Sequence, residues 1–226
     1  MFRGAGYEPS LFIMVAATVS IVFLRTLPLA EYMGLWLSLL VLFSLGDAVR
    51  QQAINVPNAS FNFAITVSGA LYVGWLGSYL ILLRNLQQPQ GLIWTLVVIF
   101  SAAMTDTGGY LFGSLFGKHK IAPSISPKKS WEGYFGGILF GGLFTWLATV
   151  ILHIYFPEII GIHGLIIGTV LSIFVPFGDL AESMFKRQFQ IKDTSHILPG
   201  HGGILDRIDS SLWAIVIGYY LILILI

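Results

Sequence analysis

The chain has 226 residues, of which 56% are hydrophobic and 10% charged, and its formal net charge is +1. Soluble globular domains carry about 25% charged residues, so the composition excludes a water-soluble protein, and we expect no nucleic-acid partner. The sequence contains no cysteine, which excludes disulfides and thiol chemistry. Long apolar runs predict an all-α, polytopic integral membrane protein, because a β-barrel would show short alternating segments.

We predict seven membrane spans, and a count of six to nine is acceptable because several segments are shorter than the roughly 20 residues needed to cross. In chain order the segments are 11–24, 32–46, 61–83, 91–106, 133–156, 159–178 and 210–226. The first is expected to be a retained helix and not a cleaved signal peptide, since no small-residue cleavage site follows it.

The basic residues predict the orientation of these spans. With the N-terminus in the cytoplasm, ten basic residues lie inside, and only Arg25 and Arg84 lie outside. The inner ten are Arg3, Arg50, Lys118, Lys120, Lys128, Lys129, Lys186, Arg187, Lys192 and Arg207. Because cytoplasmic loops are enriched in Lys and Arg, we expect the loop 117–133 and the polar stretch 179–209 to meet at the cytoplasmic surface.

Glycines recur every four residues in two segments. One set is Gly109, Gly113 and Gly117, and the other is Gly133, Gly137 and Gly141. Small residues at this spacing let membrane helices approach closely, so these glycines predict helix packing.

Acidic residues cluster where apolar segments end. Asp179, Glu182, Ser183 and Lys186 would form one polar helical stripe. A carboxylate at a membrane boundary is costly unless it is paired or binds a cation; the alternative is a solvated helix end with a Glu182–Lys186 pair.

Further acids are Asp206 and Asp209, one helical turn apart at the start of the last span, and Asp106 after an apolar run. Favourable placement at a helix N-terminus is the alternative for the first two, and a cap or turn beside Gly108 is the alternative for Asp106. Oxygen ligands without cysteine suit Mg²⁺ or Mn²⁺ and not zinc.

Basic and hydroxyl groups surround these acids in the sequence. One group is Lys186, Arg187, Lys192 and Arg207, and the other is Ser126, Lys128, Lys129 and Ser130. The loop 198–203 adds His201, Gly202 and Gly203, where glycines let backbone N–H groups approach an anion. A topology signal is the alternative for the lysines, a helix cap for the serines and a structural role for His201. Cations beside carboxylates are the pattern of metal-assisted phosphoryl transfer.

Residues 183–209 resemble the signature of the phosphatidate cytidylyltransferase family. The matching positions are Ser183, Phe185, Lys186, Arg187, Lys192, Asp193, Ser195, Leu198, Pro199, His201, Gly202, Gly203, Asp206, Arg207 and Asp209. The similarity covers roughly residues 100–212 and includes the lysine loop. We therefore divide the chain into N-terminal membrane helices, 1–98, and a catalytic membrane region, 99–226.

The resemblance implies that CTP and phosphatidic acid react to CDP-diacylglycerol and pyrophosphate. We expect the protein in a bacterial inner membrane, and the distribution of basic residues predicts a site that faces the cytoplasm. The resemblance also implies Mg²⁺, commonly with K⁺ nearby, a homodimer, and metal ligation by Asp179, Asp206 and Asp209. Asp106 is a further candidate ligand from its position after an apolar run, not from the resemblance. Rival interpretations are another CTP-dependent lipid enzyme, such as a polyprenol kinase, and a cation-coupled transporter.

Overall fold

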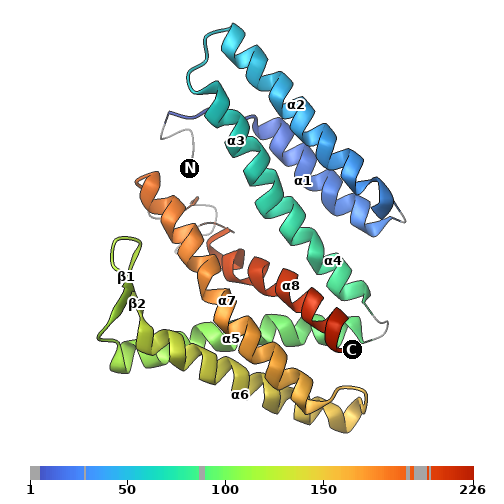
Figure 1. Ribbon diagram of the computed structural model, residues 1–226, viewed down its shortest axis with the longest axis vertical. Coiled ribbons are helices and arrows are strands. Elements are labelled where there is room, and N and C mark those ends of the chain that lie inside the picture. Colours follow the sequence, from blue (N-terminus) through green and yellow to red (C-terminus); the bar gives the residue numbers. More distant parts are fainter. Residues whose placement is uncertain (1–5, 28, 87–89, 192–193, 196–202, 204) are drawn as a thin grey trace. The chain divides into compact units, whose positions relative to one another are not determined.

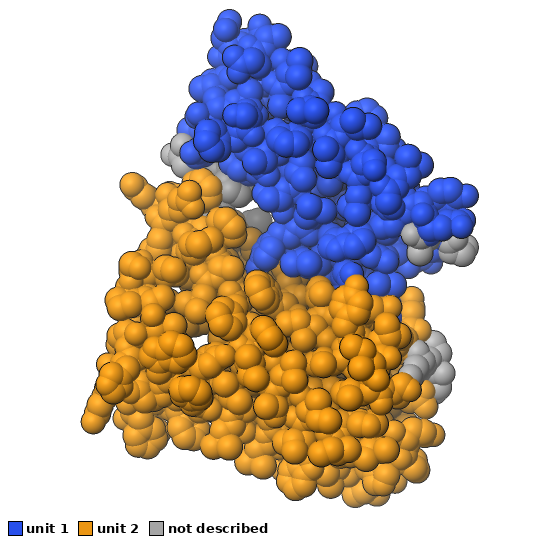
Figure 2. All heavy atoms as spheres, viewed as in Figure 1, with its two compact units in different colours: residues 1–82 blue, residues 83–226 orange. Residues whose placement is uncertain are grey.

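The computed structural model describes the chain apart from residues 1–5, 28, 87–89, 192–193, 196–202 and 204. It divides into two compact units, Met1–Leu82 and Leu83–Ile226 (Figure 2). Both are helical, and the only strands among the described residues form one short hairpin. The all-α prediction is therefore confirmed, while the functional division at residue 98 stays a prediction.

Unit 1 consists of α1 (Leu11–Thr26), the 3₁₀ turn η2 (Ala30–Tyr32), α2 (Met33–Ala53), α3 (Ala59–Gly69), a π-helical stretch η3 (Ala70–Trp75) and the start of α4 (Leu76–Asn85). Its core is built around Ile21, Leu24 and Met33. Asn62, which is fully buried on α3, donates a 2.8 Å hydrogen bond to the side-chain oxygen of Gln51 on α2. This bond joins two apolar helices through polar groups that lipid could not satisfy.

Unit 2 contains α5 (Gly91–Phe116), strands β1 (Lys120–Ala122) and β2 (Ser126–Ser130), α6 (Trp131–Tyr155), α7 (Gly161–Gln188) and α8 (Leu205–Leu225). The helix α5 packs along α6, α6 along α7, and α7 along α8 (Figure 1). The hairpin connects α5 to α6 and lies at the end of the unit where α7 finishes. Lys129 of the lysine loop pairs with Asp179 of the charged stretch, so the predicted meeting of the two segments is confirmed, while its place at the cytoplasmic surface stays a prediction.

Within the described residues, six helical segments are long and apolar enough to cross a membrane. They are Met33–Ala53, Ala59–Asn85, Gly91–Phe116, Trp131–Tyr155, Gly161–Gln188 and Ile208–Leu225. The remaining predicted span, 11–24, corresponds to α1, an apolar helix of 16 residues. The protein is thus a polytopic membrane protein, and its helices run deeper into the flanking polar sequence than predicted.

The helix α5 gives the clearest correction to the sequence prediction. We expected a span that ends at Asp106, and one alternative for that residue was a cap or turn. In the structure α5 continues for ten residues beyond Asp106, to Phe116. The cap or turn interpretation is wrong. Gly108 and Gly109 do not end the helix, because α6 packs directly against them and stabilises the helical conformation.

Glycines bring α5 and α6 into backbone contact, as predicted. A Cβ on Gly133 would lie 2.7 Å from the carbonyl oxygen of Gly109, and one on Gly137 would lie 2.9 Å from that of Thr105. Beyond them, Gly141 leaves room for the buried hydroxyls of Thr105 and Ser172, which lie 2.6 Å apart. These contacts fix the α5, α6 and α7 segments that carry the candidate site.

The β-hairpin was not predicted from the sequence. Its strands are antiparallel, with Lys120 opposite Ser130 and Ala122 opposite Ser126. The hydroxyl of Ser130 accepts a 3.2 Å hydrogen bond from the Gly133 amide and caps α6, which confirms the predicted capping role. The lysines therefore lie on a defined strand that leads directly into a membrane helix.

Candidate functional site

The helix α7 presents the predicted polar stripe after a proline. Pro176 lacks a backbone N–H, so it interrupts the helical hydrogen-bond ladder one turn before the acids. Two carbonyls near Pro176 accept hydrogen bonds from outside α7: the Ile173 oxygen from the Tyr134 hydroxyl at 3.0 Å, and the Pro176 oxygen from Lys129 Nζ at 3.0 Å. This part of α7, which precedes the acidic stripe, is thus held from α6 and from β2.

Three carboxylates meet where α7 and α8 are in close contact. Asp179, Glu182 and Asp209 each offer an oxygen atom, and these atoms all lie within 4.8 Å of one another. We call these three residues the acidic cluster. Glu182 and Asp209 are buried, so the cluster concentrates negative charge in a poorly solvated place, which is costly without a counter-charge.

Glu182 supplies the test of whether a cation fits the acidic cluster. Its side chain is 3% exposed, and its Oε1 atom has no hydrogen-bond partner among the described residues. Its other oxygen lies 3.1 Å from Lys186 Nζ. A buried, unpartnered carboxylate oxygen among oxygen ligands is what Mg²⁺ or Mn²⁺ prefers, so the residues present fit a hard divalent cation.

Asp206 lies beside the acidic cluster, but its oxygens have other partners. Oδ1 is 3.1 Å from Lys186 Nζ, while Oδ2 accepts hydrogen bonds from the Gly203 amide at 2.7 Å and from the amide and hydroxyl of Thr194 at 3.1 Å. Burial alone would raise the pKa of Asp206. The donor amides of Gly203 and Thr194 and the Lys186 ammonium outweigh burial, and the pKa of Asp206 lies well below its usual value.

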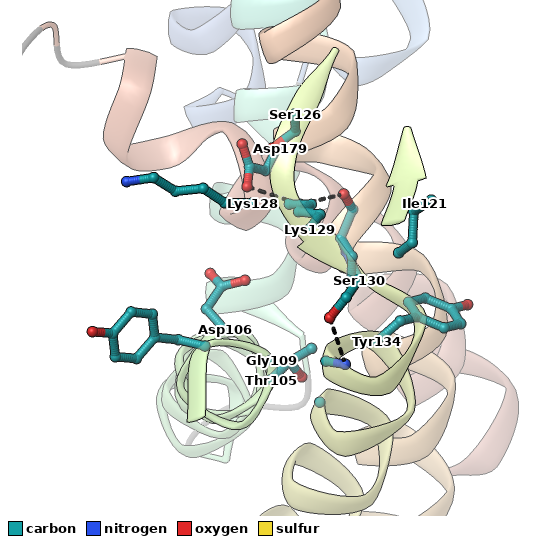
Figure 3. A pocket seen from close by; sticks show the side chains of 14 residues that line it. Thr105, Asp106, Gly109, Ile121, Ser126, Lys128, Lys129, Ser130, Tyr134 and Asp179 are labelled. Atoms are coloured by element: carbon teal, nitrogen blue, oxygen red, sulfur yellow. Dashed lines mark hydrogen bonds and ion pairs between the residues drawn. The ribbon is translucent and has the colours of Figure 1, made fainter. Parts of the chain in front are cut away.

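Two cavities adjoin at this place, each of about 340 Å³. The first, which we call the lysine cavity, is bounded by the hairpin, α5, α6 and α7 and includes Ser126, Lys128, Lys129 and Ser130 (Figure 3). The second, the carboxylate cavity, is lined by the acidic cluster together with Lys186 and Asp206. Asp106 and Asp179 line both cavities, so an anion held by the lysines would lie next to a cation held by the acids.

The hairpin contacts α7 at two further points. Lys129 Nζ lies 2.8 Å from Asp179 Oδ2, as Figure 3 shows. At the hairpin turn, Arg187 Nε donates a 3.2 Å hydrogen bond to the Ile125 carbonyl. Lys128 is exposed and lines the lysine cavity. Arg187 therefore binds the hairpin, whereas the two lysines face the cavity.

The structure brings together most of the residues singled out in the sequence. Glu182 was recognised in the stripe but not as a candidate ligand; its position one turn after Asp179 was the available signal. Lys192, His201 and Gly202 lie outside the described residues, as does the side chain of Arg207. Gly203 is described, and its amide binds Asp206.

Comparisons with known proteins agree with this arrangement. A sequence model described as "Cytidylyltransferase family" matches residues 3–225. The chain belongs to this family. It is 35% identical over 209 residues to the "Phosphatidate cytidylyltransferase" of Staphylococcus aureus strain COL, covering 90% of this chain and 78% of the relative.

A second relative, the "Phosphatidate cytidylyltransferase" of Bacillus subtilis strain 168, is 42% identical over 156 residues, which are 68% of this chain and 55% of that protein. The Staphylococcus epidermidis protein of the same name (strain RP62A) is 43% identical over 133 residues, 57% of this chain and 48% of its own length. Membership of the cytidylyltransferase family makes the protein a nucleotidyltransferase, and its membrane helices make it an integral membrane enzyme.

Proposed function

We propose that the protein transfers the cytidylyl group of CTP to phosphatidic acid and releases CDP-diacylglycerol and pyrophosphate. The name shared by the relatives supports these substrates. The observation that carries the proposal is the pair of adjoining cavities, one lined by lysines and the other by carboxylates, that share Asp106 and Asp179. Two mutually repelling anions react only if cations hold them together, and this arrangement offers two kinds of cation.

The acidic cluster is the proposed binding place for the divalent ion, with Asp106 beside it. When bound, Mg²⁺ would neutralise phosphate oxygens and the pyrophosphate leaving group. The partners of Asp206 favour a different role from the ligation predicted for it: it orients Lys186 toward the carboxylate cavity. K⁺ as a second cation stays a prediction from the family resemblance.

The lysine cavity would bind phosphate. Lys128 and Lys129 supply positive charge, and the hydroxyl of Ser126 is a further donor. The lipid phosphate is already ionised at pH 7, so one of its oxygens can bond to the α-phosphorus of CTP while the bond to pyrophosphate breaks. The chemistry therefore needs no general base, and the work of the side chains is to position and neutralise charge.

We also infer that the site faces the cytoplasm of a bacterium, at its plasma membrane. The bacterial relatives and the ten-to-two distribution of basic residues support this placement, and CTP is found on that side. The homodimer implied by the family resemblance stays a prediction.

The deciding experiment uses purified protein in detergent with CTP, Mg²⁺ and phosphatidic acid. We expect equal amounts of pyrophosphate and the liponucleotide, and neither in the presence of EDTA. A lipid kinase would release CDP in place of pyrophosphate, and a transporter would give neither product. An Asp209→Asn protein that folds but turns over at the wild-type rate would contradict the metal assignment.

A further inference from the structure

Lys129 holds one of the three carboxylates that are proposed to bind a cation. Its ammonium lies 2.8 Å from Asp179 Oδ2 and 3.0 Å from the Pro176 carbonyl oxygen, and its side chain is 21% exposed. Asp179 also belongs to the acidic cluster. The Lys129 ammonium and a divalent cation would therefore compete for the same carboxylate, because both are attracted by its negative charge.

The hairpin that carries Lys129 is fastened independently of this ion pair. At its base, Glu132 accepts hydrogen bonds from the His119 amide and lies 2.6 Å from the His119 ring nitrogen. At its turn, the Ile125 carbonyl is bound by Arg187. The lysine side chain has four rotatable bonds, so it can leave Asp179 while the strand stays in place.

The Lys129 ammonium also has a second possible binding position, in the lysine cavity beside the hairpin. It lines the lysine cavity together with Lys128 and Ser126, where the proposed function places a phosphate. Moving from a carboxylate to a phosphate exchanges one charge-assisted hydrogen bond for another of similar strength. The ammonium would therefore remain paired in both positions.

We propose that Lys129 is a counter-ion of Asp179 that a divalent cation displaces, and that the released ammonium then binds a substrate phosphate. The proposal rests on the proposed function, because it needs the acidic cluster to bind a cation. It assigns an order to the site: the cation comes first, and it makes Lys129 available to the anionic substrate.

The first test is a titration with Mn²⁺ alone, followed by the electron paramagnetic resonance signal of the free ion. Lys129→Met should bind Mn²⁺ about fivefold more tightly than the wild type, as expected for the loss of a partly exposed competing ion pair. Lys128→Met removes the same charge from the neighbouring position, which forms no ion pair within the described part of the chain, and should change the affinity less than twofold. Equal effects of the two substitutions, or weaker binding by Lys129→Met, would overturn the proposal.

The second test uses the wild-type protein and does not depend on whether a variant folds. Mg²⁺ should accelerate acylation of Lys129 by an amine-reactive ester at least about threefold relative to Lys128, measured by mass spectrometry, because a side chain released from Asp179 and the Pro176 carbonyl is more accessible to the reagent. An unchanged or slower rate would contradict displacement. If the wild type binds no Mn²⁺, or Asp209→Asn binds it equally well, the metal assignment itself fails; with those controls intact, only the role of Lys129 is at stake.

Discussion

A Cβ atom on Gly178 would lie 2.8 Å from the carbonyl oxygen of Asp209, so α7 and α8 are almost in backbone contact where both present their acids. Gly178 directly precedes Asp179, and the same missing Cβ also leaves room for the Trp213 ring. The absence of one side chain thus determines how closely carboxylates from two helices can approach each other.

Replacing Gly178 should therefore separate the acidic cluster without altering any of its carboxylates. In Gly178→Ala, α7 and α8 must move apart, and we expect activity to fall roughly ten- to a hundredfold, because small misplacements of catalytic groups are costly. Mn²⁺ affinity should fall in parallel. Gly46→Ala is the matched control, since the added methyl group there would have no described atom within 4 Å other than those of its neighbours and of its own helix backbone; equal activity of both variants would refute the spacing argument.

Glu182→Gln should keep the fold but bind metal poorly. The amide preserves the shape of the side chain and removes the charge, so Mn²⁺ affinity should drop at least about tenfold. Glu158→Gln removes the same charge from an exposed position in the loop before α7 and should leave the affinity unchanged. Unaltered Mn²⁺ binding by Glu182→Gln, measured in the same titration, would exclude Glu182 as a ligand.

Pro176→Ala should stabilise the protein and reduce its activity. Alanine supplies the N–H that the helical ladder lacks at this position, and a proline inside a helix costs about 3 kcal/mol. The same repair would change the course of α7 at Pro176 and redirect Asp179, three residues later. We expect a higher unfolding temperature together with a lower kcat; a variant that gains stability and keeps full activity would show that Pro176 has no part in positioning Asp179.

Divalent cations should stabilise the folded protein. Mg²⁺ at about one hundred times its dissociation constant contributes about 2.7 kcal/mol, which corresponds to an increase of about 5–10 °C in Tm for a chain of this size. EDTA should reverse the increase, and Asp209→Asn should show none. A thermal shift that is the same in Asp209→Asn and in the wild type would place the stabilising ion elsewhere.

The sequence predicted correctly those features that depend only on the spacing of residues along one helix. The spacing of Asp179, Glu182 and Lys186 placed them on one face of a helix, and the ion pair between Lys186 and Glu182 follows from that spacing. The glycine repeats predicted close helix contacts for the same reason. Periodicity shows which residues share a face, and in both cases that was enough.

Other features depend on contacts between different segments of the chain, which the spacing of residues within one helix does not reveal. Asp206 and Asp209 look equivalent in the sequence. In the structure the amides of Thr194 and Gly203 donate hydrogen bonds to Asp206, whereas Asp209 belongs to the acidic cluster. The strands of the hairpin have three and five residues, which is too short for a strand pattern. The extension of α5 beyond Asp106 depends on α6, a partner that lies elsewhere in the sequence.

The length of α7 has a consequence for the depth at which the enzyme works. It is a single helix of 28 residues, and at 1.5 Å per residue it is about 42 Å long, against a hydrocarbon thickness of about 30 Å. Asp179 lies about 27 Å from the start of α7 at Gly161, and Lys186 lies about 10 Å further along the helix. If α7 enters the hydrocarbon layer at Gly161 and runs along the bilayer normal, Asp179 would lie near the opposite boundary of that layer and Lys186 level with the lipid headgroups. The proposed reaction would then not require the lipid to be lifted out of its leaflet.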